Sequence, residues 1–217
     1  DGEKIVTASM DSTAKIWDAA IGKLLADLKG HASDVRSAQF SPDGKKIITA
    51  SWDNTVRVWD VYRGKWLTEL IGHTNAVRSA RFSPDGKKII TASEDNTSKI
   101  WNGETGKLLY TFYAIDSADY LAQLPSGYYQ STPNASKLLH YVTKDLKVIS
   151  FEQLDVKYNR PDLVLEAIGN PDTALINTYR NAYVKRIKKL GIDTASFRDG
   201  FSVPEADFVN RDDIHIE

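Results

Sequence analysis

A stretch of twenty residues that recurs at a fixed interval constrains the fold of this chain more than any other feature. Residues 41–60 read SPDGKKIITASWDNTVRVWD, and residues 83–102 repeat fifteen of those positions at an offset of 42 residues. A third copy occupies residues 1–18 at the same offset. Periods of this length are typical of repeat arrays, in which each copy is one small structural unit. The repeat therefore predicts the architecture of the first half of the chain.

The middle copy contains the residue pattern of four short β-strands. In the middle copy the segments alternate apolar and polar residues or are rich in β-branched residues. Turn-forming sequences separate them, the first being Ser-Pro-Asp-Gly at residues 41–44. Four antiparallel strands in about 40 residues are typical of one propeller blade. The expected strands are Val35–Phe40, Lys45–Ser51, Thr55–Trp59 and Trp66–Ile71.

Gly30-His31, the Ser51-x-Asp53 turn and Trp59-Asp60 resemble the WD-repeat family. The resemblance implies a β-propeller whose blades each bury a hydrogen-bonded set of His, Ser or Thr, Asp and Trp. In the first copy the His position would precede the chain, and in the third Asn102 replaces the final Asp. The implied sets are Ser9, Asp11 and Trp17; His31, Ser51, Asp53 and Trp59; and His73, Ser93, Asp95 and Trp101.

The recurrence of Ser, His and Asp also allows a catalytic interpretation, as a nucleophilic triad. A set that repeats at a fixed period favours a structural role instead. A buried His or Asp is costly unless its polar atoms are hydrogen-bonded, and joining them satisfies both. We therefore expect no catalytic residue in this chain.

The residue before the blade Asp is where otherwise similar copies differ. It is Met10, Trp52 and Glu94 in the three copies, and it is expected on an exposed turn at one rim. In WD-repeat proteins this rim often contacts partners. Arg36 and Arg78 start the first strands of their blades, near that rim. Because Trp and Arg are frequent hot-spot residues, these five residues are the candidate partner-binding set. The alternative is that Trp52 only packs on a neighbouring loop.

The repeat breaks down after Trp101. Ala-Ile stands at residues 114–115, where Gly-His is expected. Tyr120–Leu124 and Tyr128–Thr132 flank a Pro-Ser-Gly turn and predict a hairpin, interpreted as a degenerate fourth repeat. A short helix is expected over Asn134–Val142, and a strand or extended segment over Leu146–Phe151.

Two helices are predicted further on. One opens at Arg160-Pro161-Asp162 and stops at Gly169; the other opens at residues 170–172 and runs to Leu190. The second carries five basic residues, which allow either a surface for nucleic acid or an acidic partner, or a solvated helix end. The solvated end is the favoured interpretation. The basic residues are Arg180, Lys185, Arg186, Lys188 and Lys189.

Residues 117–190 carry a second resemblance, through PSGYY at 125–129, FEQ at 151–153 and YNRPD at 158–162. They resemble the junction in large bacterial WD-repeat proteins where a propeller precedes further domains, some caspase-like. The chain has no Cys, so no catalytic His–Cys pair can be transferred to it, and any protease domain would lie beyond Glu217.

Composition excludes several classes of function. The net charge of −1 gives no general attraction to nucleic acid or membrane, and no apolar run approaches the length of a membrane span. No signal peptide, phosphate-binding loop or zinc-protease motif is visible, and His140 and His215 are isolated. We expect a cytoplasmic protein without metal or cofactor, whose partners are proteins.

The expected fold class is mainly β: a partial WD-repeat β-propeller of about three blades plus a degenerate hairpin, followed by an α-helical extension. The expected domains are propeller blades at 1–115, a degenerate blade or junction at 116–151, the helical extension at 152–191, and a linker or the start of a further domain at 192–217.

The expected function is a non-catalytic protein–protein interaction scaffold from a larger multidomain protein. The alternative is a sensor or docking region that regulates an enzymatic domain outside this chain. The first copy begins inside a turn, so a fragment of a longer protein is expected. Three blades do not close a ring, since propellers have about 4–8. Upstream blades or self-association would have to complete it.

Overall fold

The computed structural model describes residues 2–137, 141–142, 148–149 and 151–191. The linker expected at 192–217, together with Asp1, His140 and His215, lies outside the described residues. The chain forms two compact units, residues 1–114 and residues 115–217, and each is considered by itself.

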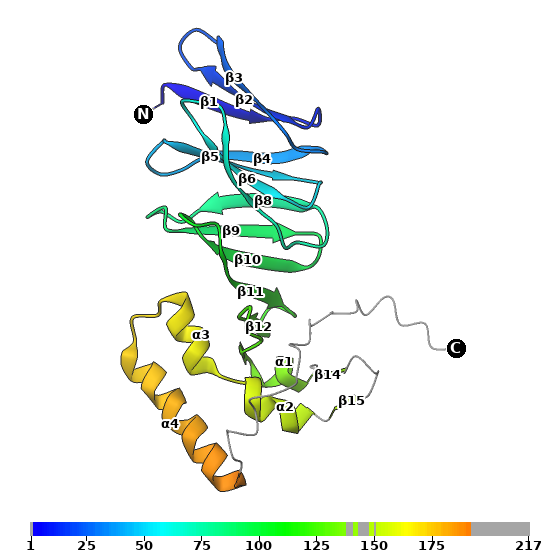
Figure 1. Ribbon diagram of the computed structural model, residues 1–217, viewed down its shortest axis with the longest axis vertical. Coiled ribbons are helices and arrows are strands. Elements are labelled where there is room, and N and C mark those ends of the chain that lie inside the picture. The colour runs from blue at the N-terminus through cyan, green and yellow to red at the C-terminus, as the bar shows by residue number, and fades with distance from the viewer. Residues whose placement is uncertain (1, 138–140, 143–147, 150, 192–217) are drawn as a thin grey trace, which may run out of the picture. The chain divides into compact units, whose positions relative to one another are not determined.

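The first unit consists of three antiparallel β-sheets stacked in chain order (Figure 1). Within each sheet the strands pair in sequence order. This arrangement confirms the expected fold class, a partial propeller in which each sheet is one blade. Blade 1 comprises β1 (Lys4–Ala8), β2 (Thr13–Asp18) and β3 (Leu24–Lys29); blade 2 comprises β4 (Val35–Phe40), β5 (Lys46–Ser51), β6 (Val56–Asp60) and β7 (Trp66–Leu70); blade 3 comprises β8 (Val77–Phe82), β9 (Lys88–Ser93), β10 (Thr97–Asn102) and β11 (Leu108–Ala114).

Local sequence explains why the three blades share one geometry. The turn between β5 and β6 places Asn54 at φ 69°, and its counterpart Asn96 lies at φ 62°. Asn tolerates this left-handed conformation better than most residues. The register is also the same in each blade, with Ile47 opposite Trp59 and Ile89 opposite Trp101.

The hydrophobic core of the unit lies between consecutive blades. Because side chains alternate along a strand, Ile47 and Trp59 project from one face of blade 2 and Ile48 and Val58 from the other. The first pair packs with Ile16 and other side chains of blade 1. The second pair packs with side chains of blade 3. Blade 2 therefore presents one apolar face to blade 1 and the other to blade 3.

The second unit opens with the predicted hairpin, in which β12 (Tyr120–Gln123) pairs with β13 (Tyr129–Ser131). The two predicted helices also form. The helix α3 (Pro161–Ile168) ends at Gly169, and α4 (Thr173–Leu190) ends at Gly191. Asp172 caps α4, because its side chain accepts a hydrogen bond from the Leu175 N–H.

Two sequence expectations in this unit are wrong in their extent. The helix expected over Asn134–Val142 is α1 (Pro133–Lys137), and β14 (Tyr141–Val142) pairs instead with β15 (Val148–Ile149). β-Branched and aromatic side chains favour this pairing over helix. The segment expected to be extended up to Phe151 ends earlier, because Phe151 starts the unforeseen helix α2 (Phe151–Tyr158).

Candidate functional site

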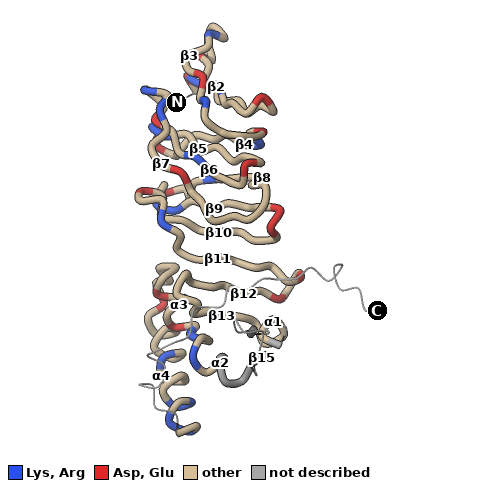
Figure 2. Tube along the Cα trace, turned by 45° about the vertical axis from the view of Figure 1, so that its right-hand side comes forward, with Lys and Arg blue, Asp and Glu red and all other residues tan. Residues whose placement is uncertain are grey.

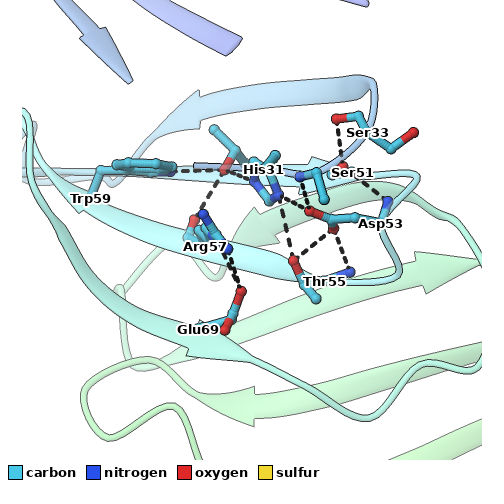
Figure 3. A network of polar contacts seen from close by, with 10 residues as sticks. His31, Ser33, Ser51, Asp53, Thr55, Arg57, Trp59 and Glu69 are labelled. Carbon is cyan, nitrogen blue, oxygen red and sulfur yellow. Dashed lines mark hydrogen bonds and ion pairs between the residues drawn. The ribbon is translucent and has the colours of Figure 1, made fainter. Parts of the chain in front are cut away.

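A chain of hydrogen bonds crosses the interior of blade 2 from one rim towards the core (Figure 3). His31 Nδ1 lies 2.8 Å from Asp53 Oδ2, and His31 Nε2 lies 2.7 Å from Thr49 Oγ1. Thr49 Oγ1 also accepts a hydrogen bond of 2.8 Å from Trp59 Nε1. His31, Thr49 and Trp59 are buried. The hydrogen-bond chain thus joins β5 and β6 to the loop that precedes β4.

The hydrogen-bonding capacities of the four groups fix the protons in this chain. Trp59 Nε1 can only donate, so Thr49 Oγ1 accepts there, and it donates its own proton to His31 Nε2 at 2.7 Å in preference to the Arg57 carbonyl at 3.4 Å. His31 Nδ1 then carries the imidazole proton and donates it to the Asp53 carboxylate. A neutral His31 thereby satisfies every member, so the set stabilises the blade and offers no free nucleophile.

Ser51 does not occupy the place that the family resemblance implied. Its Oγ donates to the Ser33 carbonyl and accepts from the Asp53 N–H, so Ser51 supports the turn. The hydroxyl that links His31 with Trp59 belongs to Thr49. Residues two apart on a strand point to the same face, and Thr49 lies nearer the strand centre than Ser51. The recurrence of Thr7, Thr49 and Thr91 at the repeat offset was a usable signal for this residue.

Blade 3 contains the same chain of contacts. His73 bonds to Asp95 at 2.7 Å and to Thr91 at 2.7 Å, and Trp101 donates to Thr91 at 3.0 Å. Ser93 again bonds to the turn, through the Asp95 N–H.

Blade 1 contains a reduced version of the set. Trp17 donates to Thr7 at 2.9 Å, and the Ser9 hydroxyl accepts from the Asp11 N–H. The Asp11 carboxylate accepts from Thr13 and pairs with Lys15 at an exposed position. The difference between blades provides internal controls for experiments on blades 2 and 3.

The glycine before each His is required by its surroundings. Gly30 has φ 152°, and a Cβ there would lie 2.2 Å from Arg57 Nη1 and 3.6 Å from the Trp59 ring. Gly72 has φ 154°, and its Cβ would lie 3.2 Å from the Trp101 ring. A larger residue would collide with the Arg57 guanidinium at position 30 and crowd the Trp101 ring at position 72, and both positions have a positive φ that favours glycine.

Burial and hydrogen bonding shift the pKa values of two groups in blade 2, His31 and Asp53. Burial lowers the pKa of His31 below its ordinary value of 6.5, although Asp53 opposes this effect. Burial alone would raise the pKa of Asp53, but hydrogen bonds from Thr55, the Ala32 N–H and His31 outweigh it and lower the pKa to about 2.

Both shifts predict that the protein loses stability on acidification. A group whose folded-state pKa is lowered stabilises fully above its unfolded pKa and less as the pH falls. We expect the free energy of unfolding to decrease below pH 6.5 as His31 titrates, and again between pH 3.8 and about 2 as Asp53 titrates. Chemical unfolding at a series of pH values measures this. In the variant His31→Gln, the free energy of unfolding should decrease less between neutral pH and the onset of Asp53 titration. The same pH dependence in this variant as in the parent chain would contradict the role given to His31.

The rim carries the five candidate partner-binding residues. Met10 is 71% exposed and Trp52 is 44% exposed. The Arg36 guanidinium lies 4.5 Å from the centre of the Trp52 ring, a cation–π contact within one blade. In blade 3 the equivalent contact is an ion pair of 2.9 Å between Arg78 and Glu94. Trp52 therefore rests on Arg36 and keeps much of its surface open to solvent.

In the second unit, two buried carboxylates are joined to the basic helix α4. Asp155 accepts from Tyr129 Oη at 2.5 Å and from Arg186 at 2.5 Å. Asp162 is fully buried and forms ion pairs with Arg160 at 2.7 Å and Arg180 at 3.6 Å. Two of the five cations on α4 are thus used within the unit. The charges of α4 are visible in Figure 2.

Across residues 2–137, 141–142, 148–149 and 151–191, no cluster of His, Asp and Glu has the makings of a metal site. Within those same ranges, no helix combines the length and the apolar character that crossing a membrane requires.

The sequence profile of the family described as "WD domain, G-beta repeat" matches residues 1–18, 22–60 and 64–102. The first segment covers β1 and β2, the second covers β3 and then β4–β6, and the third covers β7 and then β8–β10. Each segment therefore ends on the strand that carries the Trp of one hydrogen-bonded set. The three matched segments, which lie within residues 1–102, are similar to WD repeats. The rest of the chain lies outside the match.

Curated proteins resemble the chain over short segments. WD40 repeat-containing protein HOS15 of Arabidopsis thaliana is 49% identical over 39 residues. Denticleless protein homolog B of Xenopus laevis is 50% identical over 38 residues, and the Gallus gallus Denticleless homolog is 53% identical over 38 residues. Each match covers 18% of this chain and only 5–6% of the relative.

Proposed function

We propose that this chain is a non-catalytic scaffold that binds a protein partner at the rim formed by Met10, Trp52 and Glu94 with Arg36 and Arg78. The observation that carries the proposal is the Arg36–Trp52 pair, an exposed aromatic ring held by a guanidinium. Trp and Arg supply a large share of the binding energy in protein interfaces. A ring already held in place loses little conformational entropy on binding.

The hydrogen bonding of the polar groups inside the blades favours a scaffold function over an enzymatic one. In blade 2 the Asp53–His31–Thr49–Trp59 chain is satisfied internally and buried, so its His and hydroxyl are not available to a substrate. The same holds for His73 and Thr91 in blade 3. The position before the blade Asp differs in all three copies and lies instead at the rim, where Met10 and Trp52 are exposed.

A second candidate is that the region docks onto or regulates an enzymatic domain elsewhere in a larger multidomain, cytoplasmic protein. The observation that favours it is the network around Asp155 and Asp162, which joins the residues of the junction motif into one folded unit. Such a unit can transmit an orientation, unlike a flexible linker. A reading frame that continues past Glu217 into a domain with His and Cys would support this candidate, and one that stops there would oppose it.

We expect Trp52→Ala to abolish partner crosslinking while changing the free energy of unfolding by less than about 1 kcal/mol, because the ring contributes one exposed cation–π contact. The measurement places a photo-reactive amino acid at position 32, an exposed residue of the loop before β4, and scores crosslinked partner in the native host, with and without Trp52→Ala. Trp66→Ala is the matched control, since Trp66 is 52% exposed and lies over Arg57 at 4.1 Å. Equal loss of crosslinking in both variants would contradict the assignment to the rim.

A further inference from the structure

One carboxylate of the rim lacks the close partner that the others have. The Asp34 side chain is 25% exposed, and its ion pair with Arg36 measures 3.9 Å, which is longer than a hydrogen bond. The Arg36 guanidinium lies instead over the Trp52 ring. The other rim carboxylates have closer partners: Asp53 with His31 at 2.8 Å, Asp95 with His73 at 2.7 Å, Glu94 with Arg78 at 2.9 Å and Asp11 with Lys15 at 3.2 Å. Asp34 therefore keeps its hydrogen-bonding capacity for a bound group.

Two backbone hydrogen bonds place Asp34 between the turns that carry Met10 and Trp52. The Asp34 carbonyl accepts from the Trp52 N–H at 2.9 Å. The N–H of the next residue, Val35, donates to the Ser9 carbonyl at 3.0 Å. Because Ser9 directly precedes Met10, Asp34 has one variable rim residue on either side.

The side chains around Asp34 fit an arginine of a partner. Arg36 covers one face of the Trp52 ring, and an aromatic ring can take a second cation on its other face. Met10, which is 71% exposed, adds an apolar surface. An arginine has an apolar stem that packs on such surfaces and a planar guanidinium that forms paired hydrogen bonds with a carboxylate. Lysine lacks the planar group, so arginine is the better match.

The charge of the rim also favours a cation. The Asp53 carboxylate keeps its negative charge, because its partner His31 is neutral. The cations Arg36 and Arg78 lie beside the rim loops and are fewer than the carboxylates in them. A negative surface attracts a cationic partner residue and repels an anionic one. The loops and turns of the rim contain carboxylates and no Lys or Arg, and they comprise residues 9–13, 30–34, 52–55, 72–76 and 94–97.

We propose that the rim binds its protein partner through an arginine of that partner, seated between Met10 and Trp52 with its guanidinium on the Asp34 carboxylate. This inference rests on the proposed function, because it names the partner chemistry of the same rim. It assigns a role to Asp34, which lies outside the five candidate partner-binding residues. The guanidinium supplies the hydrogen bonds that Asp34 lacks within its own blade.

Nuclear magnetic resonance titration of the chain tests the proposal. The probes are short synthetic peptides that carry leucine on either side of a central arginine, citrulline or glutamate. Citrulline has the shape of arginine without its charge. The arginine peptide should shift the indole N–H signal of Trp52 with a dissociation constant of about 1 mM or lower. The citrulline peptide should bind at least about 10-fold more weakly, and the glutamate peptide should not bind.

Substitutions of Asp34 separate its charge from the fold of the rim. Asp34→Asn should weaken binding of the arginine peptide at least about 10-fold, and Asp34→Lys should make the glutamate peptide the preferred one. Both variants should fold, because the Asp34 carboxylate forms only the long ion pair with Arg36. Glu94→Gln is the matched control. Beside Glu94, at the position of Asp34, stands Ala76, so this variant should change the affinity by less than about twofold.

Equal binding of the arginine and citrulline peptides by the parent chain would overturn the proposal. So would an unchanged affinity in Asp34→Asn, or a loss of about 10-fold in Glu94→Gln. Crosslinking from position 32 that requires Trp52, together with no binding of the arginine peptide, would overturn this inference and leave the proposed function standing.

Discussion

Replacing Thr49 by valine is expected to lower the free energy of unfolding by about 2–6 kcal/mol, although valine has nearly the same shape. The substitution removes the hydroxyl that accepts from Trp59 Nε1 and donates to His31 Nε2. Both nitrogens would remain buried without a partner, and each such group costs about 1–3 kcal/mol. Chemical unfolding followed by circular dichroism measures the change.

Two variants act as controls for this prediction. Thr7→Val changes the same repeat position in blade 1, where Thr7 is exposed and water can replace the lost contact with Trp17. Its effect should be below about 1 kcal/mol. Ser51→Ala removes the hydroxyl that the family resemblance placed in the set, and it should cost less than Thr49→Val. A larger effect of Ser51→Ala would mean that Ser51, not Thr49, holds the set together.

Replacing Asp53 by alanine is expected to destabilise the protein by about 3 kcal/mol, well beyond the effect of an ordinary surface substitution. The carboxylate accepts hydrogen bonds from His31 Nδ1, the Ala32 N–H, and both the N–H and the hydroxyl of Thr55. Its removal leaves these donors without an acceptor and frees the turn between β5 and β6. Asp95→Ala should behave alike, because its contacts in blade 3 are the same.

Asp11→Ala is the matched control for Asp53→Ala. Asp11 occupies the same repeat position, but within the described chain it bonds only to neighbouring residues of its own turn and strand. Its contacts are exposed, so its removal should destabilise the protein much less than the removal of Asp53. Equal destabilisation by Asp11→Ala and Asp53→Ala would show that the turn, and not the buried contact to His31, determines the stability of the blade.

The repeat pattern allowed the strands and turns of the first unit to be predicted almost to the residue. Pro-Asp-Gly turns, β-branched strands and a fixed offset are local signals, and they repeat, so each copy supports the interpretation of the others. The helix ends at Gly169 and Gly191 were predicted for the same reason, because a glycine stop is a local conformational preference.

The errors fall where no local signal distinguishes two outcomes. Leu138 and Val142 fit a helical stripe, yet Tyr141 and Val142 pair with Val148 and Ile149. That choice depends on a partner strand, which a helical pattern does not reveal. Thr49 was missed because a Ser and a Thr hydroxyl form the same hydrogen bonds. Ser51 and Thr49 lie on one face of the same strand, and packing determines which of the two hydroxyls reaches the Trp59 ring.

The sequence by itself determined that the chain contains three copies of one β-blade and that His31, Asp53 and Trp59 recur together in such a blade. These conclusions need only periodicity and the hydrogen-bonding capacity of side chains. The tertiary structure decided which hydroxyl completes the set, that Arg180 and Arg186 serve internal carboxylates, and that Ile5 is exposed while Ile47 is buried. Those facts depend on which surfaces meet in space, because identical residues in successive copies differ only in whether a neighbouring blade covers them.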